Sequence, residues 1–167
     1  MRATALRYDV PGVDLVLEFS LEVLGHFTTH KQIRHRSKEA GGQLFANMDD
    51  PGTWRVIDVT GPRPLDIRAL FGYRPNRKQE RKEISERYAC DLHFIGDWHS
   101  HPEELPHPSL TDNESMRETV QNSLHDLPGF VMVIVGRAHF PPGLHVSFHQ
   151  RDGAVYVLKA REESGSV

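Results

Sequence analysis

Cysteine is almost absent: the chain of 167 residues contains only Cys90. A disulfide framework within the chain is therefore excluded, and so is a metal site built on cysteine ligands. Disulfide bonds are typical of oxidising compartments, so this composition favours a cytoplasmic protein.

Long apolar runs and a strong excess of one charge are absent too. No run approaches the ~20 apolar residues of a membrane-spanning helix, and residues 1–6 lack the apolar core of a secretory signal. The formal net charge of −3 gives no electrostatic basis for binding nucleic acid or an anionic membrane. We therefore expect no nucleic acid and no membrane among the partners.

The remaining composition is that of an ordinary globular domain. Apolar residues make up 38% and charged residues 26% of the chain, and this length can bury a sizeable core in one domain. Hydrophobic alternation and turn residues organise the first half of the sequence. The expected elements are a strand over residues 13–19, a helix from the capping Ser20 to about His35, and a hairpin of strands 43–47 and 54–60.

Residues 63–91 are mostly polar and loop-like, with one possible helix over residues 76–89. Four side chains of that helix should be exposed, namely Gln79, Arg81, Lys82 and Glu83. Two interpretations of the segment stay open. It is either a polar connection or a substrate-contacting surface, because it leads directly into the strand that carries the histidines described below.

Strands and helices also alternate in the second half. The expected elements are a strand over residues 92–96, a helix over 110–124, a fully buried strand over 130–135, and a hairpin of strands 144–148 and 154–158. The sequence thus predicts a single mixed α/β domain over residues 1–160, in which helices flank a central mixed sheet. A polar tail over residues 161–167 should follow it.

Two histidines and an aspartate follow the strand over residues 92–96. His99 and His101 are two positions apart, so their side chains share one face of a strand end. Pro102 lacks an N–H and ends the strand, and Asp112 stands at the start of the next helix. Two imidazoles and one carboxylate leave a fourth tetrahedral position open, as a catalytic zinc requires. A lone His-x-His pair is more often solvated, so the hypothesis depends on all three meeting at one rim of the sheet.

Hydrolysis at such a metal needs a carboxylate that takes a proton from water and gives it to the leaving group. Glu39 is the best candidate, because the Gly41-Gly42 pair after it lets the backbone approach closely. Glu103 and Glu104 are closer in sequence, but they lie on the loop after the histidines, where we expect them to face solvent.

Two other polar residues near the histidines have ordinary explanations. Ser109 stands three residues before Asp112, which is the spacing of a helix capping box. Asp97 shares a strand face with His99 and could orient an imidazole. A solvated or structural carboxylate is the alternative interpretation of Asp97.

Together these residues resemble a known signature. The order His99-Ser-His101-Pro, six residues, Ser109, two residues and Asp112 is similar to the JAMM signature of JAB/MPN-domain metallopeptidases. The segment that begins at Glu39 resembles the upstream element that bears the family's catalytic glutamate. The stretch Gly-Asp-Trp-His-Ser-His-Pro-Glu is most similar to stand-alone bacterial members, which occur in antiphage operons such as CBASS. The likeness covers roughly residues 13–160 and implies a single MPN/JAB domain with a topology like that of cytidine deaminases.

The resemblance also implies a role for each matching position. His99, His101 and Asp112 would bind one zinc ion. Glu39 would be the general base and acid, and Ser109 would donate a hydrogen bond to the tetrahedral oxyanion. Capping and oxyanion donation would be competing uses of the Ser109 hydroxyl.

The implied activity is that of an isopeptidase or peptidase acting on the extended C-terminal tail of a protein. It would remove a ubiquitin-like protein or a conjugated nucleotidyltransferase from its target, or trim a C-terminal precursor, beside E1- and E2-like operon partners. The tail would pair with a sheet edge. Two alternatives stay open, namely C-terminal processing of a sulfur-carrier protein and a non-catalytic MPN scaffold. A zinc nucleobase deaminase is excluded, because the chain has no Cys-x-x-Cys pair.

Overall fold

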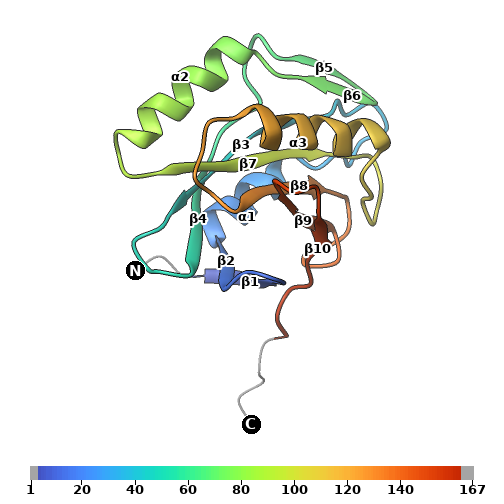
Figure 1. Cartoon of the computed structure of the whole chain (residues 1–167). Coiled ribbons are helices and arrows are strands. Elements are labelled where there is room, and N and C mark those ends of the chain that lie inside the picture. The colour runs from blue at the N-terminus through green and yellow to red at the C-terminus, as the bar shows by residue number, and fades with distance from the viewer. Residues whose placement is uncertain (1–3, 163–167) are drawn as a thin grey trace.

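The computed structural model describes residues 4–162, in which a large mixed sheet has helices on both faces (Figure 1). Its strands are β1 (Thr4–Val10), β2 (Leu15–Ser20), β3 (Gly41–Asn47), β4 (Thr53–Val59), β7 (His93–Ser100), β8 (Gly129–Val135), β9 (Leu144–Gln150) and β10 (Val155–Val157). They lie in the order β1-β2-β4-β3-β7-β8-β9-β10. The pairs β2–β4 and β7–β8 are parallel, and the other neighbours are antiparallel.

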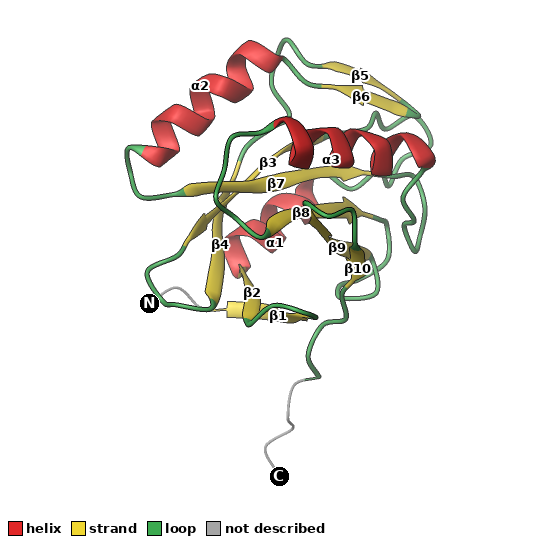
Figure 2. Ribbon diagram, viewed as in Figure 1, coloured by secondary structure: helices red, strands yellow, loops and turns green. Residues whose placement is uncertain are grey.

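Helices and a short ribbon complete the described part of the chain (Figure 2). The helices are α1 (Leu21–Thr29), α2 (Arg77–Tyr88) and α3 (Leu110–Asn122), and the two strands of the ribbon are β5 (Ile67–Ala69) and β6 (Gly72–Arg74). The helix α3 makes the crossover between the parallel strands β7 and β8. None of the described helices is long and apolar enough to cross a bilayer.

One face of the sheet carries the main apolar core. Helix α1 closes this face with Val23 and Phe27, which lie among the valines of β8 and the leucines of β2 and β3. Trp98 of β7 packs against Phe27 with ring centroids 5.3 Å apart. Ser20 begins α1, since its side chain accepts a hydrogen bond from the Val23 N–H at 3.3 Å. The histidine-bearing strand is therefore backed by a well-packed apolar layer.

The apolar cluster on the opposite face of the sheet is smaller, and the packing there is more polar. Helix α3 covers part of it with Met116 and Val120. The buried residues of α2 are Glu80 and Glu83. Glu83 is paired with Arg63, whose Nε donates to Glu83 Oε1 at 2.7 Å. Polar contacts therefore replace apolar packing under α2.

The predicted mixed α/β fold is confirmed. The expected hairpin corresponds to β3 and β4, and the expected second and third helices correspond to α2 and α3. The strand predicted to be fully buried is β8, all of whose residues are buried. The ribbon and β1 are absent from the predictions, and the exposure predicted for Glu83 is wrong because Arg63, twenty positions earlier, draws it inward.

The prediction that the first helix runs to about His35 is wrong. His30 ends α1, and its backbone N–H donates to Phe27 O. Beyond this point Gln32 is buried, and its Nε2 donates to Ser37 O at 3.0 Å and to Leu70 O at 3.2 Å. These tertiary hydrogen bonds override the helical pattern and direct the chain toward Glu39.

The end of the described chain is bound to the first strand. Arg161, which begins the predicted polar tail, donates its backbone N–H to Arg7 O at 2.8 Å and forms an ion pair with Asp9. Residues 163–167 of that tail lie outside the described residues.

Candidate metal centre

The two histidines lie at the end of β7, as the alternation of strand side chains predicts. The strand ends at Ser100, four residues beyond its predicted end, and the next N–H, that of His101, still donates to Val135 O at 3.0 Å. The side chains of His99 and His101 point toward the face of the sheet that α3 covers. Trp98, which precedes His99, points the opposite way into the apolar core. The His99 Nε2 and His101 Nε2 atoms are 3.1 Å apart.

Asp112 reaches the histidines from the first turn of α3. Ser109 begins this helix with a capping box, in which Ser109 Oγ accepts from the Asp112 N–H at 3.1 Å and Asp112 Oδ2 accepts from the Ser109 N–H at 2.7 Å. The cap fixes the carboxylate so that its Oδ1 lies 3.2 Å from His99 Nε2 and its Oδ2 lies 3.3 Å from His101 Nε2. Burial alone would raise the pKa of Asp112, but hydrogen bonds from His101 and His99 hold it well below its usual range.

The spacing of these ligand atoms fits one metal ion. Atoms bound at ~2.0–2.2 Å to a tetrahedral ion lie about 3.3–3.6 Å apart. The two Nε2 atoms here are 3.1 Å apart, and they lie 3.2 and 3.3 Å from different oxygens of Asp112, which is close to that spacing. Two neutral imidazole nitrogens that face each other can share only one proton, whereas a cation between them would satisfy both lone pairs. All three candidate ligand atoms lie within 4.8 Å of one another.

Glu39 lies beside this cluster without belonging to it. Its Oε1 is 3.7 Å from His101 Nε2, and the residue is only 7% exposed. Burial raises the pKa of Glu39 to about 7, with His101 lowering it and Asp112 raising it in turn. A carboxyl with a pKa near neutrality can both take and release a proton. The close backbone approach predicted here exists, since a Cβ on Gly41 would lie 2.9 Å from Trp98 O and a Cβ on Gly42 would overlap with Thr60 O.

A cleft of about 720 Å³ opens over the metal ligands and Glu39. Its walls come from α3 on one side and from the ribbon and the start of α2 on the other. Ser109 also lines the cleft. Its hydroxyl accepts a hydrogen bond as the helix cap, which leaves its own hydrogen free to donate. The two uses of Ser109 are therefore compatible, and the expectation that they compete is wrong.

The sequence matches a family of proteins described as prokaryotic homologs of the JAB domain, over residues 21–149. That span includes all of the predicted site residues and most of the sheet. The chain belongs to this family. In this JAB domain, two histidines, an aspartate and a glutamate from three separate segments meet at one rim of the sheet.

Two relatives of this JAB domain are CD-NTase/cGAS isopeptidases. The protein of Vibrio cholerae is 32% identical over 126 residues, which cover 71% of this chain and 77% of the relative. The protein of Escherichia coli strain TW11681 is 30% identical over 120 residues, covering 70% and 73%. A probable metalloprotease of Sinorhizobium fredii is 26% identical over 106 residues, covering 61% and 65%.

The fold of the JAB domain also occurs among solved structures. A protein from Desulfitobacterium hafniense superimposes with a TM-score of 0.58 at 18% identity, over 86% of this chain and 88% of that one. A protein from Salinibacter ruber gives a TM-score of 0.53 at 20% identity, over 89% and 94%. At these identities the likeness extends to the fold alone.

Two further carboxylates of the JAB domain lie near the candidate ligands. Glu103 is exposed, as predicted, yet its Oε1 lies 2.9 Å from His101 Nδ1 and fixes the ring so that Nε2 faces the cluster. The only signal in the sequence is the two-residue spacing from His101. Asp97 makes no side-chain hydrogen bond to either imidazole among the described residues. It lies in the cleft wall near Glu80, and burial raises its pKa to about 7.

Proposed function

We propose that this JAB-domain protein is a zinc-dependent isopeptidase that releases a conjugated protein from its target. The observation that carries the proposal is the position of Glu39, 3.7 Å from a histidine of a three-ligand cluster and inside an open cleft. A buried carboxylate that adjoins the ligands, yet is not one of them, is what metal-assisted hydrolysis needs as a proton carrier.

The residues of the cluster suit zinc. His99, His101 and Asp112 would hold the ion through two nitrogens and one carboxylate, a ligand set that leaves a position open for substrate or water. Zinc supplies a Lewis acid that polarises a carbonyl and lowers the pKa of water toward ~7. Glu103 keeps the His101 ring in the orientation that presents Nε2.

Glu39 and Ser109 would carry out the remaining steps. Glu39 takes a proton from the attacking water and delivers it to the nitrogen that leaves, so the lysine amine departs neutral. Ser109 donates its free hydroxyl hydrogen to the oxyanion that forms on the scissile carbonyl. The cap hydrogen bond from the Asp112 N–H holds this hydroxyl in place before substrate arrives.

The substrate we propose is a protein with an extended C-terminal tail joined to a lysine side chain. Relatives at 32% and 30% identity are CD-NTase/cGAS isopeptidases, which supports a conjugated CD-NTase as the first candidate and a ubiquitin-like protein as the second. The tail would enter the cleft between α3 and the ribbon. E1- and E2-like operon partners would make the conjugate, in a cytoplasmic antiphage system.

The test uses two purified conjugates and one linear fusion. A CD-NTase and a ubiquitin-like protein are each linked through the C-terminus to a lysine of a carrier protein, and the same ubiquitin-like protein is also given a short linear C-terminal extension. The wild-type chain with zinc should release the carrier from an isopeptide conjugate, and a chelator should stop the release. Glu39→Ala should lose activity by at least about a hundredfold, whereas Glu114→Ala, an exposed glutamate on α3, should keep it.

Each alternative function gives a different pattern in the same assay. Cleavage of the linear fusion alone would mean precursor processing, as for a sulfur-carrier protein. No cleavage of any of the three, by protein that contains zinc, would favour a non-catalytic scaffold.

A further inference from the structure

The peptide units on either side of Glu39 are held by the ribbon rather than by the main sheet. The Glu39 N–H donates to Ala69 O at 2.7 Å. The Glu39 carbonyl accepts from Arg68 Nε, also at 2.7 Å, and the same guanidinium reaches Lys38 O at 3.4 Å. One ribbon strand thus satisfies both backbone groups of the residue that carries the proposed base.

A second set of contacts holds the next residue from the opposite side. The Ala40 N–H donates to Ser100 Oγ at 2.9 Å, and Ser100 Oγ donates to Gln32 Oε1 at 2.9 Å. Ser100 lies between His99 and His101 and is fully buried. This side of the segment is therefore fixed by the strand of the metal ligands, while the other side depends on the ribbon.

The ribbon itself has little apolar support. Ile67 is 65% exposed and Phe71 is 85% exposed. Polar contacts hold it instead: the Tyr73 hydroxyl lies 2.6 Å from Asp66 Oδ2 and 2.9 Å from Gly41 O. Asp66 also accepts from the N–H groups of Arg63 and Asn76, at 2.8 and 2.7 Å.

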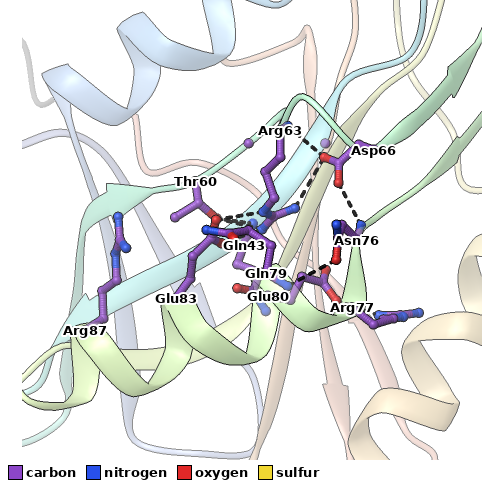
Figure 3. Close-up of polar contacts among 12 residues, drawn as sticks. Gln43, Thr60, Arg63, Asp66, Asn76, Arg77, Gln79, Glu80, Glu83 and Arg87 are labelled. Atoms are coloured by element: carbon purple, nitrogen blue, oxygen red, sulfur yellow. Dashed lines mark hydrogen bonds and ion pairs between the residues drawn. The ribbon is translucent and has the colours of Figure 1, made fainter.

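Figure 3 shows how this polar cluster connects the ribbon to α2. Arg63 lies at its centre and reaches Glu83 on α2, Asp66 before the ribbon and Thr60 after β4. The side chains of Arg63, Glu83 and Asp66 are 6%, 8% and 0% exposed. The cluster anchors the base of the ribbon, and Arg68 is the side chain that extends from the anchored ribbon to the Glu39 peptide.

We propose that Arg68 is a positioning residue for Glu39: its hydrogen bond to the Glu39 carbonyl sets the place of the carboxylate beside the metal ligands. This inference rests on the proposed function. Arg68 contributes no ligand and takes no proton. Its loss leaves the metal site and the Ser100 contact in place, but it frees one side of the peptide that carries the base.

The test compares Arg68→Ala and Arg68→Lys with Arg74→Ala. Arg74 is an exposed residue on the other strand of the same ribbon. Its substitution by alanine removes the same charge as Arg68→Ala. With the isopeptide conjugate, kcat of Arg68→Ala should fall roughly tenfold to a hundredfold, the range for loss of one charge-assisted hydrogen bond. KM and zinc content should stay within about twofold of wild type, since the substrate and metal contacts are kept. Arg68→Lys retains a donor and should recover part of kcat.

A readout independent of catalysis is hydrogen exchange in the metal-free protein. The amides of residues 38–41 should exchange faster in Arg68→Ala and at the wild-type rate in Arg74→Ala. Equal kcat and equal exchange for the two variants would overturn the inference. A raised KM at unchanged kcat would overturn it too, because Arg68 would then be a substrate contact. If wild-type protein cleaves no conjugate, the proposed function fails, while exchange at residues 38–41 still shows whether Arg68 holds the Glu39 peptide.

Discussion

Helices α1 and α2 cover the two faces of the central sheet in opposite ways. Under α1 the contact is apolar: Val23 and Phe27 are fully buried against Trp98 and the inner side chains of β8. Under α2 the contact is ionic, and the helix is docked through Glu83 and Arg63. The candidate metal centre lies on the second face, at the end of a strand whose other side is set in the first.

This difference suggests that one face mainly provides stability and the other mainly provides catalysis. Apolar burial is non-directional and tolerates no charge, so it suits a rigid support. Ion pairs and hydrogen bonds are directional, so they can fix the orientation of a peptide such as that of Glu39. We expect the apolar face to dominate unfolding and the polar face to dominate catalysis. The following changes test that division, in order of decreasing effect on the free energy of unfolding.

Phe27→Ala should have the largest effect on stability. It removes a fully buried ring from the α1 face, which costs about 3–5 kcal/mol. Urea unfolding followed by circular dichroism measures the loss. Below the unfolding transition the variant should still bind zinc as wild type does. A loss below about 1 kcal/mol would mean that α1 is not the main support of the sheet.

Arg63→Met should destabilise the polar face by about 3 kcal/mol, because it leaves Glu83 and Asp66 buried without their partner. Adding Glu83→Leu should restore most of the loss, since an apolar pair avoids the uncompensated charge. Arg161→Met removes an exposed ion pair with Asp9 and should leave the unfolding midpoint nearly unchanged. If it costs as much as Arg63→Met, burial is not what makes the Arg63 cluster important.

The Arg63 cluster is a part of the structure that could not be predicted from the sequence. The strand histidines and the capping box of Asp112 follow from local periodicity and spacing, so His99, His101 and Asp112 could be named in advance. The burial of Glu83 could not, because it depends on a partner twenty positions away and α2 has no apolar stripe. The ribbon could not be predicted either, because its strands are three residues long and their residues are exposed or only half-buried.

Acid should weaken the folded state through His149 on β9. This residue is 3% exposed, and burial, aided by His145, lowers its pKa to about 4. In the unfolded chain the imidazole has its ordinary pKa of about 6.5 and binds a proton below that pH, whereas in the folded chain it stays neutral until the pH approaches 4. The contribution of His149 to stability should therefore be full above about pH 6.5 and fall by up to about 3 kcal/mol as the pH approaches 4, while Glu39 and Asp97, whose pKa values burial raises, change stability in the opposite direction. His149→Gln should flatten this slope in metal-free protein, and an unchanged slope would assign the effect to other groups.

The two helix-capping serines should give a smaller change and form a matched pair. Ser20 caps α1 and Ser109 caps α3. Each Ser→Ala change should cost about 1 kcal/mol of unfolding free energy. Only Ser109→Ala should also lower kcat, by about a hundredfold or more, because only that hydroxyl lines the cleft. Equal kcat for the two variants would limit Ser109 to capping.

The central claim is that His99, His101 and Asp112 hold one zinc ion while Glu39 stands beside it as the proton carrier. Elemental analysis of the gently purified wild-type, Glu39→Ala and His99→Ala proteins tests this claim most directly. We predict about one zinc per chain in wild type and in Glu39→Ala, and far less than one in His99→Ala. Zinc lost from Glu39→Ala, or retained in His99→Ala, would contradict the assignment of ligands and base.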